Sequence, residues 1–216
     1  MTRHSYKGEA ALLTDNKIAS KSAKLPTPPP QRPKNDLVRA REYLLPLEVE
    51  RMVKAAAAAG RYGLRDRCLI MIMYRYALRA KEASDFLWSQ IELKAGIIHI
   101  KRCKGGMDGT RSIDGAELTA LRKLRREYPN SRFVFVSERD TRLSERSIHH
   151  IIARAGRLAG LDFTAHPHML RHGCGYRLAN KGFDTRLIQE YLGHRHIESV
   201  VTYTQLAPGR FDGLWN

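Results

Sequence analysis

From residue 45 onward, apolar side chains recur at the three- and four-residue spacing of amphipathic helices. Proline, serine, aspartate or glycine marks the expected ends of these segments, as is common at helix termini. The segment 64–76 carries apolar residues on nearly all faces of the predicted helix, which is typical of a central, buried helix. The predicted helices cover residues 45–60, 64–76, 117–128, 144–159, 167–179 and 184–191.

Alternating apolar residues between the second and third predicted helices indicate short β-strands. Residues 91–100 have the pattern of a strand that is broken by a tight turn at Lys94-Ala95-Gly96. A flexible turn at residues 104–109 leads from it into a second strand at 110–113. The short apolar segment 133–136 also has β character. The predicted fold class is therefore mainly α with a small antiparallel β-sheet, an α+β fold.

The composition divides the chain of 216 residues into three parts. Residues 1–38 are polar, basic and rich in proline, so we expect a flexible or extended segment that cannot fold alone. Residues 39–205 are long enough for one domain with a single core. In this part, Val200-Val201 is predicted to be a short apolar turn. Residues 206–216 form a tail whose apolar side chains need a surface to pack on, namely Leu206, Phe211, Leu214 and Trp215.

The charge is strongly positive, because 38 lysines and arginines face 22 aspartates and glutamates. An excess of this size indicates a polyanionic partner, and nucleic acid fits it better than a membrane. The longest apolar run, Cys68 to Met73, is far too short to span a bilayer. Three separate cysteines without a secretory signal indicate reduced thiols in a cytoplasmic protein.

Three stretches near the carboxyl end carry residues suited to phosphoryl transfer. His168 and Arg171 lie three residues apart and so share one face of the predicted helix. His194 follows a helix that stops at Gly193, and Tyr203 comes nine residues later. A guanidinium group binds a phosphate through two parallel hydrogen bonds, and histidine can take the proton of a phenol that attacks it. This chemistry requires neither a metal nor a cofactor.

The order His168-x-x-Arg171, Gly193-His194 and Tyr203 resembles the carboxyl-terminal signature of the tyrosine recombinases, the phage integrase family. The spacing also matches, with 23 residues from Arg171 to His194 and 32 to Tyr203. The tract around these residues is most similar to the compact invertases that switch fimbrial promoters. Upstream, Ala77-Leu78-Arg79 with Glu82 resembles the first arginine box of the family, which typically reads Gly-Leu-Arg-x-x-Glu.

The resemblance implies the catalytic-domain architecture of that family over residues 39–205, and a site-specific recombinase that cleaves DNA through a 3′-phosphotyrosyl intermediate. Tyr203 would be the nucleophile, and Arg79 and Arg171 would hold the phosphate oxygens. His168 would be the base, and Lys104 in the hairpin turn would be the acid, with Lys101 as the alternative. His194 would contact the phosphate or help to place the tyrosine, and Glu82 would hold Arg79.

The resemblance also implies contacts with double-stranded DNA and with other copies of the chain. The helix over 144–159 would lie against DNA, with a basic set formed by Arg142, Arg146, Arg154 and Arg157. Paired recombination sites would hold a homotetramer, while the free protein would be a monomer or a weak oligomer. The tail 206–216 would dock on a neighbouring protomer. Such an enzyme would work in the cytoplasm, associated with the nucleoid.

Three other functions account for part of the pattern. A metal nuclease would explain the crowding of His166, His168, His172 and Cys174, although the carboxylate cluster typical of hard cations is missing from this tract. A non-catalytic regulator that binds DNA would explain the charge but not Tyr203. A type IB topoisomerase would share the tyrosine chemistry. For a recombinase, the outcome (inversion, resolution or integration) depends on how the DNA sites are arranged.

Overall fold

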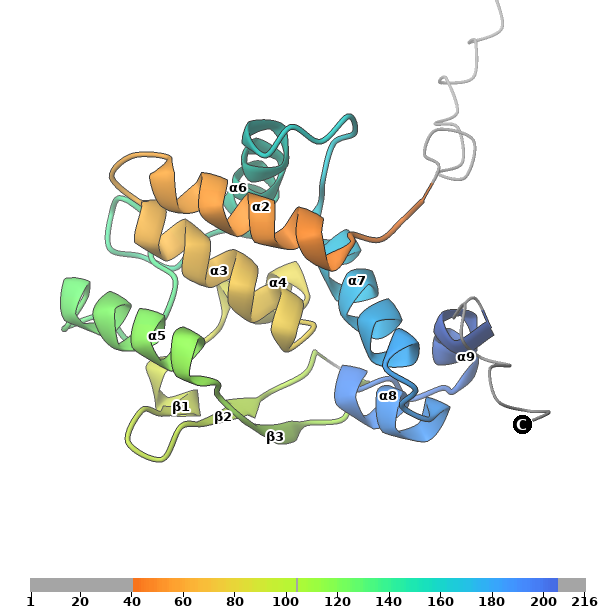
Figure 1. Ribbon diagram of the computed structural model, residues 1–216. Coiled ribbons are helices and arrows are strands. Elements are labelled where there is room, and N and C mark those ends of the chain that lie inside the picture. Colours follow the sequence, from red (N-terminus) through yellow and green to blue (C-terminus); the bar gives the residue numbers. More distant parts are fainter. Residues whose placement is uncertain (1–40, 104, 206–216) are drawn as a thin grey trace, which may run out of the picture. The chain divides into compact units, whose positions relative to one another are not determined.

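The computed structural model describes residues 41–103 and 105–205, which lie within one compact unit. The predicted flexible segment 1–38, the predicted tail 206–216 and Lys104 lie outside the described residues. Figure 1 shows the arrangement of the described elements. The helices are α2 (Pro46–Ala58), α3 (Gly63–Arg75), α4 (Ala80–Ser84), α5 (Gly115–Glu127), α6 (Glu145–Leu158), α7 (Pro167–Asn180), α8 (Thr185–Leu192) and α9 (Glu198–Gln205).

The predicted helices are confirmed, and their ends follow from local chemistry. Pro46 and Pro167 occupy the first helical position of α2 and α7, where a missing N–H costs no hydrogen bond. The Asp184 side chain caps α8 by accepting hydrogen bonds from the backbone N–H groups of Arg186 and Leu187. Gly193 ends α8 in the left-handed conformation, with φ of 69°. The sequence therefore fixes where His194 leaves the helix.

Helix α3 is the centre of the core, as its pattern predicts. It packs against α2, α5 and α7, and Figure 1 shows it lying between α2 and α5. Leu69, Ile70 and Met73 are fully buried. Because α3 ends at Arg75, it delivers residues 76–79 to the place where α7 crosses the domain.

The sheet is antiparallel, with the strand order β1 (Ile91–Glu92), β2 (Ile97–Ile100) and β3 (Gly109–Ser112). In its register, Ile91 pairs with Ile98 and Ile100 pairs with Gly109. The predicted α+β class, mainly helical with a small antiparallel sheet, is confirmed. No helix in the described part of the chain is long and apolar enough to cross a membrane.

Two short segments differ from the prediction. Residues 133–136 form isolated bridges at Phe133 and Val136 in place of a strand, because they pair with irregular segments at Leu87 and Arg142. Val200 and Val201, predicted as a turn, lie inside helix α9. A helix of this length is marginal alone, and its packing on α7 and α8 stabilises it. That tertiary contact could not be read from the local pattern.

Candidate active site

Arg79 lies at the amino end of α4, where its backbone and side chain both meet Glu82. The Glu82 carboxylate accepts a hydrogen bond from the Arg79 backbone N–H at 3.0 Å and from its Nη1 at 2.8 Å. The Glu82 side chain is 2% exposed and the Arg79 side chain 35%. Glu82 thus binds the guanidinium on one side and leaves part of it exposed.

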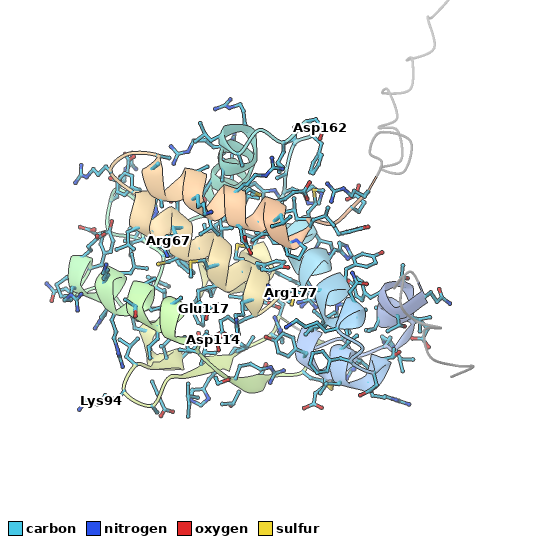
Figure 2. All side chains as sticks on the ribbon, in the orientation of Figure 1. Arg67, Lys94, Asp114, Glu117, Asp162 and Arg177 are labelled. Carbon is cyan, nitrogen blue, oxygen red and sulfur yellow. The ribbon has the colours of Figure 1, made fainter. Side chains whose placement is uncertain are left out.

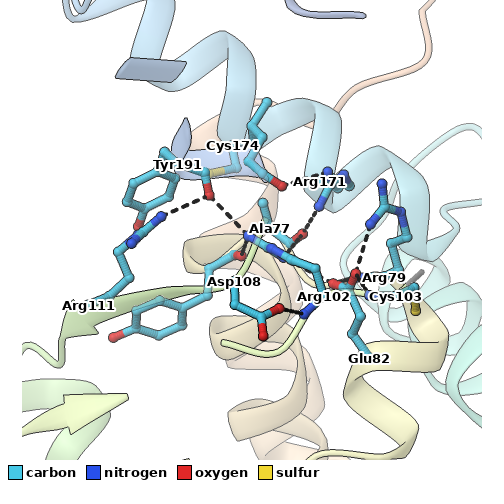
Figure 3. Close-up of polar contacts among 12 residues, drawn as sticks. Ala77, Arg79, Glu82, Arg102, Cys103, Asp108, Arg111, Arg171, Cys174 and Tyr191 are labelled. Carbon is cyan, nitrogen blue, oxygen red and sulfur yellow. Dashed lines mark hydrogen bonds and ion pairs between the residues drawn. The ribbon is translucent and has the colours of Figure 1, made fainter. Parts of the chain in front are cut away.

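Arg171 lies on α7 and is almost completely buried. Its Nη1 donates to the carbonyl of Ala77 and its Nη2 donates to the carbonyl of Leu192 at 2.7 Å. Ala77 precedes Arg79 by two residues, and Leu192 precedes His194 by two. Figure 3 shows the guanidinium groups of Arg79 and Arg171 on the same side of this network. The two arginine boxes of the sequence therefore meet in space.

Tyr203 lies on α9 with its hydroxyl bound to Nδ1 of His172 at 2.7 Å. Its ring packs edge-on against Tyr176, with centroids 5.1 Å apart, and it is 2% exposed. Gly175 makes this packing possible, because a Cβ there would lie 3.0 Å from the Tyr203 ring. In this structure the phenol is thus buried against α7 of its own chain.

The predicted His168 and His194 lie around the same centre, together with His172. The rings of His168 and His172, one helical turn apart, meet edge-on with centroids 4.5 Å apart. His194 follows Gly193, and its Nδ1 is buried without a hydrogen-bond partner among the described residues. A buried nitrogen of this kind has an unmet capacity to bind a ligand oxygen.

Burial controls the protonation of these groups. It lowers the pKa of His172 to about 4, helped by His168 and Arg171, and that of His194 to about 4, helped by Arg171 and Arg79. Burial also lowers the pKa of His168, with Arg171 adding to the effect. Burial raises the pKa of Tyr203 to about 12, although the charge of Arg171 opposes it. At neutral pH the histidines are therefore neutral and the phenol keeps its proton.

The predicted DNA-contacting arginines lie on or beside α6, which packs against α4. Arg142 pairs with Asp85, and Arg154 pairs with the fully buried Asp66 at 2.7 Å. Arg146 and Arg157 are exposed on α6. Lys101, the alternative hairpin lysine, is exposed, while Lys104 lies outside the described residues.

A cavity of about 750 Å³ is lined by side chains of α2, α3, α5 and α7, among them Arg67, Glu117 and Arg177, which Figure 2 labels. In residues 41–103 and 105–205, no three histidine, cysteine, aspartate or glutamate side chains are arranged to hold a metal. The site is therefore defined by the convergence of side chains from α4, α7, α9 and the loop after α8.

Sequence reasoning missed two polar residues of this cluster. His172 had a usable signal, since it follows Arg171 directly and lies four residues after His168, on the same helix face. Arg102 had none, because it follows β2 in a basic stretch that looks like a solvated turn. The structure buries its side chain to 2% exposure against Glu82.

Two guanidinium groups, neutral histidines and a tyrosine on a basic, mainly helical domain define a class: enzymes that transfer a DNA phosphodiester to a tyrosine. Comparison with known proteins agrees. The model of the phage integrase family matches residues 42–210. The chain therefore belongs to the phage integrase family, and it is a site-specific tyrosine recombinase that acts on DNA.

The relatives support this assignment over most of the chain. The type 1 fimbriae regulatory protein FimB of Escherichia coli K12 is 42% identical over 183 residues, which are 82% of this chain and 91% of that protein. The crystal structure of XerA recombinase covers 87% of this chain and 65% of its own, with a TM-score of 0.69 and 25% identity. The pre-cleavage complex of XerH with its difH substrate has a TM-score of 0.65 at 25% identity and covers 76% of this chain and 50% of its own.

Ala77 stands where the family box typically has glycine, and its backbone conformation gives a prediction on stability. Its φ of 51° lies in the left-handed region, which costs a non-glycine residue roughly 1–2 kcal/mol. Ala77→Gly relieves this strain but adds freedom to the unfolded chain, which offsets part of the gain. We expect the free energy of unfolding, measured with urea, to rise by about 0.5–1 kcal/mol. The matched change Ala57→Gly, inside α2, should lower it by about 1 kcal/mol.

The two histidines with depressed pKa values predict a pH dependence of stability. Between about pH 6.5 and pH 4 the unfolded chain binds more protons at His172 and His194 than the folded chain does, so stability falls as the pH falls. After allowance for partial solvent exposure, the loss is on the order of 2 kcal/mol. Urea unfolding at both ends of this range measures it. His172→Gln should lose less than the wild type, and equal losses would contradict the assignment.

Proposed function

We propose that Tyr203 cleaves one DNA strand at a phosphate held by Arg79 and Arg171. The observation that carries this proposal is the convergence of the two guanidinium groups. Arg79 binds Glu82, and Arg171 binds the carbonyl of Ala77, which lies in the same short turn between α3 and α4. Guanidinium groups fixed in this way stabilise the charge that develops on a phosphate in the transition state.

In the proposed step, the Tyr203 oxygen forms a bond to phosphorus while the bond to the 5′ oxygen breaks. The tyrosine loses its proton, and the departing 5′ oxygen gains one and leaves as a hydroxyl. Lys104 is the residue that the family resemblance assigns to this second proton transfer, with Lys101 as the alternative. The phosphodiester energy is kept in the 3′-phosphotyrosyl bond, so a 5′-hydroxyl of a partner duplex can reverse the attack and exchange strands.

We propose that two histidines of α7 share the handling of the tyrosine proton. His172 is neutral and accepts from the phenol before DNA binds. His168 lies against His172 and is the more exposed of the two. It acts as the base when Tyr203 turns toward the phosphate. His194 supplies a hydrogen bond to the phosphate, for which its unpartnered Nδ1 is suited. If His168→Gln cleaved as fast as the wild type in a single turnover, His168 would not be the base.

The proposed assembly is a homotetramer on two paired sites, with a monomer or weak oligomer in the absence of DNA. The exposed Arg146 and Arg157 of α6, together with Arg142 and Arg154, would contact the phosphate backbone. The tail 206–216 would dock on a neighbouring protomer, and the enzyme would act at the nucleoid. Sedimentation of the protein with and without paired sites tests the assembly. Deleting residues 211–216 should prevent the tetramer without preventing binding to one site.

The covalent adduct is the direct test of the function. The DNA probe is a duplex that the protein selects from a random library, nicked so that the short fragment with the 5′-hydroxyl diffuses away. We expect a protein–DNA adduct whose DNA has a free 5′ end and a blocked 3′ end. An adduct at the 5′ end, or an adduct that forms only with added metal, would contradict the mechanism. Relaxation of supercoils without site preference would favour the topoisomerase-like alternative.

A further inference from the structure

Arg102 is the third guanidinium group of the cluster, and the proposed chemistry does not use it. Its side chain is 2% exposed, although the residue lies in the turn after β2. Nη1 donates to the Glu82 carboxylate at 3.0 Å and to the carbonyl of Ala77 at 3.1 Å. Nη2 donates to the carbonyls of Tyr76 and Tyr191, both at 3.0 Å. One side chain therefore ties together the end of α3, the start of α4 and the end of α8.

The partners of Arg102 are shared with the two arginines that hold the phosphate. Glu82 binds the guanidinium group of Arg79 through Oε1 and that of Arg102 through Oε2. The carbonyl of Ala77 accepts from both Arg102 and Arg171. At the end of α8, Arg102 binds the carbonyl of Tyr191 and Arg171 binds the next one, that of Leu192. Figure 3 shows the contacts of Arg102 with Glu82, Ala77 and Tyr191 beside Arg79 and Arg171.

The loop that presents His194 also rests on Arg102. Gly193 packs so closely that a Cβ there would lie 2.8 Å from Nε of Arg102 and 2.8 Å from the carbonyl of Met107. The backbone N–H of Met107 donates to the carbonyl of Gly193 at 3.4 Å. The turn after β2 and the loop after α8 thus lie against each other, with Arg102 between them.

We propose that Arg102 is a positioning residue for strand cleavage: it fixes Arg79, Arg171 and the His194 loop relative to one another without touching the DNA. The inference rests on the proposed roles of Arg79 and Arg171. Its physical basis is that a displacement of about 1 Å in a catalytic group can lower a rate by about 10²-fold. A guanidinium group can hold four acceptors in one plane, which an ammonium group on a flexible stem cannot.

The test compares Arg102→Met and Arg102→Lys with the wild type on the selected, nicked duplex. Single-turnover adduct formation at saturating protein measures cleavage, and a filter-binding titration of the intact duplex measures affinity. We expect Arg102→Met to lower the cleavage rate by about 10²-fold and to change the affinity by less than about threefold. Arg102→Lys keeps a charge beside Glu82, so it should recover part of the rate. Arg126→Met, at an exposed position on α5, is the matched control and should cleave like the wild type.

Chemical rescue separates positioning from a loss of folding. Guanidinium ion, added to Arg102→Ala far below denaturing concentrations, should raise the cleavage rate, because it can occupy the vacated site. A protein that is merely less stable would lose activity in guanidinium. Wild-type cleavage by folded Arg102→Met, or a rate and an affinity that fall together without rescue, would overturn the inference. If the wild type itself forms no adduct, the proposed function is wrong, and the inference about Arg102 is wrong with it.

Discussion

Tyr203→Phe is expected to bind the selected duplex with wild-type affinity and to form no covalent adduct with it. The substitution removes one oxygen atom, the proposed nucleophile, and retains the ring that packs against Gly175 and Tyr176. It leaves Nδ1 of His172 without its partner, which costs about 1 kcal/mol in stability. The adduct is measured by its reduced mobility in a denaturing gel after incubation with the nicked duplex.

Tyr176→Phe is the matched control, because Tyr176 is the aromatic neighbour of the nucleophile. It lies on α7 with its ring edge-on to that of Tyr203. We expect this variant to form the adduct, since the proposed step uses only the Tyr203 oxygen. If the adduct formed in Tyr203→Phe but not in Tyr176→Phe, the nucleophile would be Tyr176 and the proposed role of Tyr203 would be wrong. An adduct that survives in both would contradict the tyrosine mechanism at these positions.

The second large effect is a contrast between Arg79 and Arg171, the two arginines proposed to bind the phosphate. Arg79→Met and Arg171→Met should each lower the single-turnover rate of adduct formation by roughly 10²–10³-fold, the usual cost of losing a group that stabilises developing charge. Their effects on folding should differ. The Arg79 side chain is 35% exposed, and its ion pair with Glu82 contributes about 1 kcal/mol or less. Arg171 is buried, and its loss removes the donor to the carbonyl of Leu192 and one of the two donors to the carbonyl of Ala77, which costs about 2 kcal/mol.

Urea unfolding and cleavage rates, measured on the same protein samples, decide this contrast. Cleavage is compared only under conditions in which each variant is fully folded. If Arg171→Met unfolded no more easily than Arg79→Met, the two carbonyl contacts would not contribute to stability as described. If either variant cleaved at the wild-type rate, that guanidinium group would not bind the reacting phosphate.

The local features of the fold were predictable because they depend on neighbouring residues. Asp184 and Gly193 mark the two ends of α8 through their own hydrogen bonds and dihedral angles. The buried character of α3 follows from its unbroken apolar run, Cys68 to Met73. Helix α9 was missed because its stability comes from packing on α7 and α8, and these contacts join residues far apart in the chain.

The site was predictable only where a family pattern marks it. The resemblance indicated Arg79 and Arg171, and the structure places their supports side by side. Arg102 carries no such mark, because its four acceptors are one carboxylate and three backbone carbonyls on distant segments. Every residue has a backbone carbonyl, so the residue types in a sequence do not show which carbonyls will accept a hydrogen bond from a given side chain.

The carbonyl groups that hold Arg102 and Arg171 have a consequence for how the enzyme meets its substrate. Carbonyls orient a guanidinium group without cancelling its charge, and Glu82 is the carboxylate that all three arginines have nearby. The donors are therefore aimed, and still electropositive, before any polyanion arrives. Little reorganisation remains for the moment of reaction, which is the condition under which fixed dipoles and charges accelerate a step most. Added salt should weaken the first encounter with DNA far more than it slows the chemistry that follows.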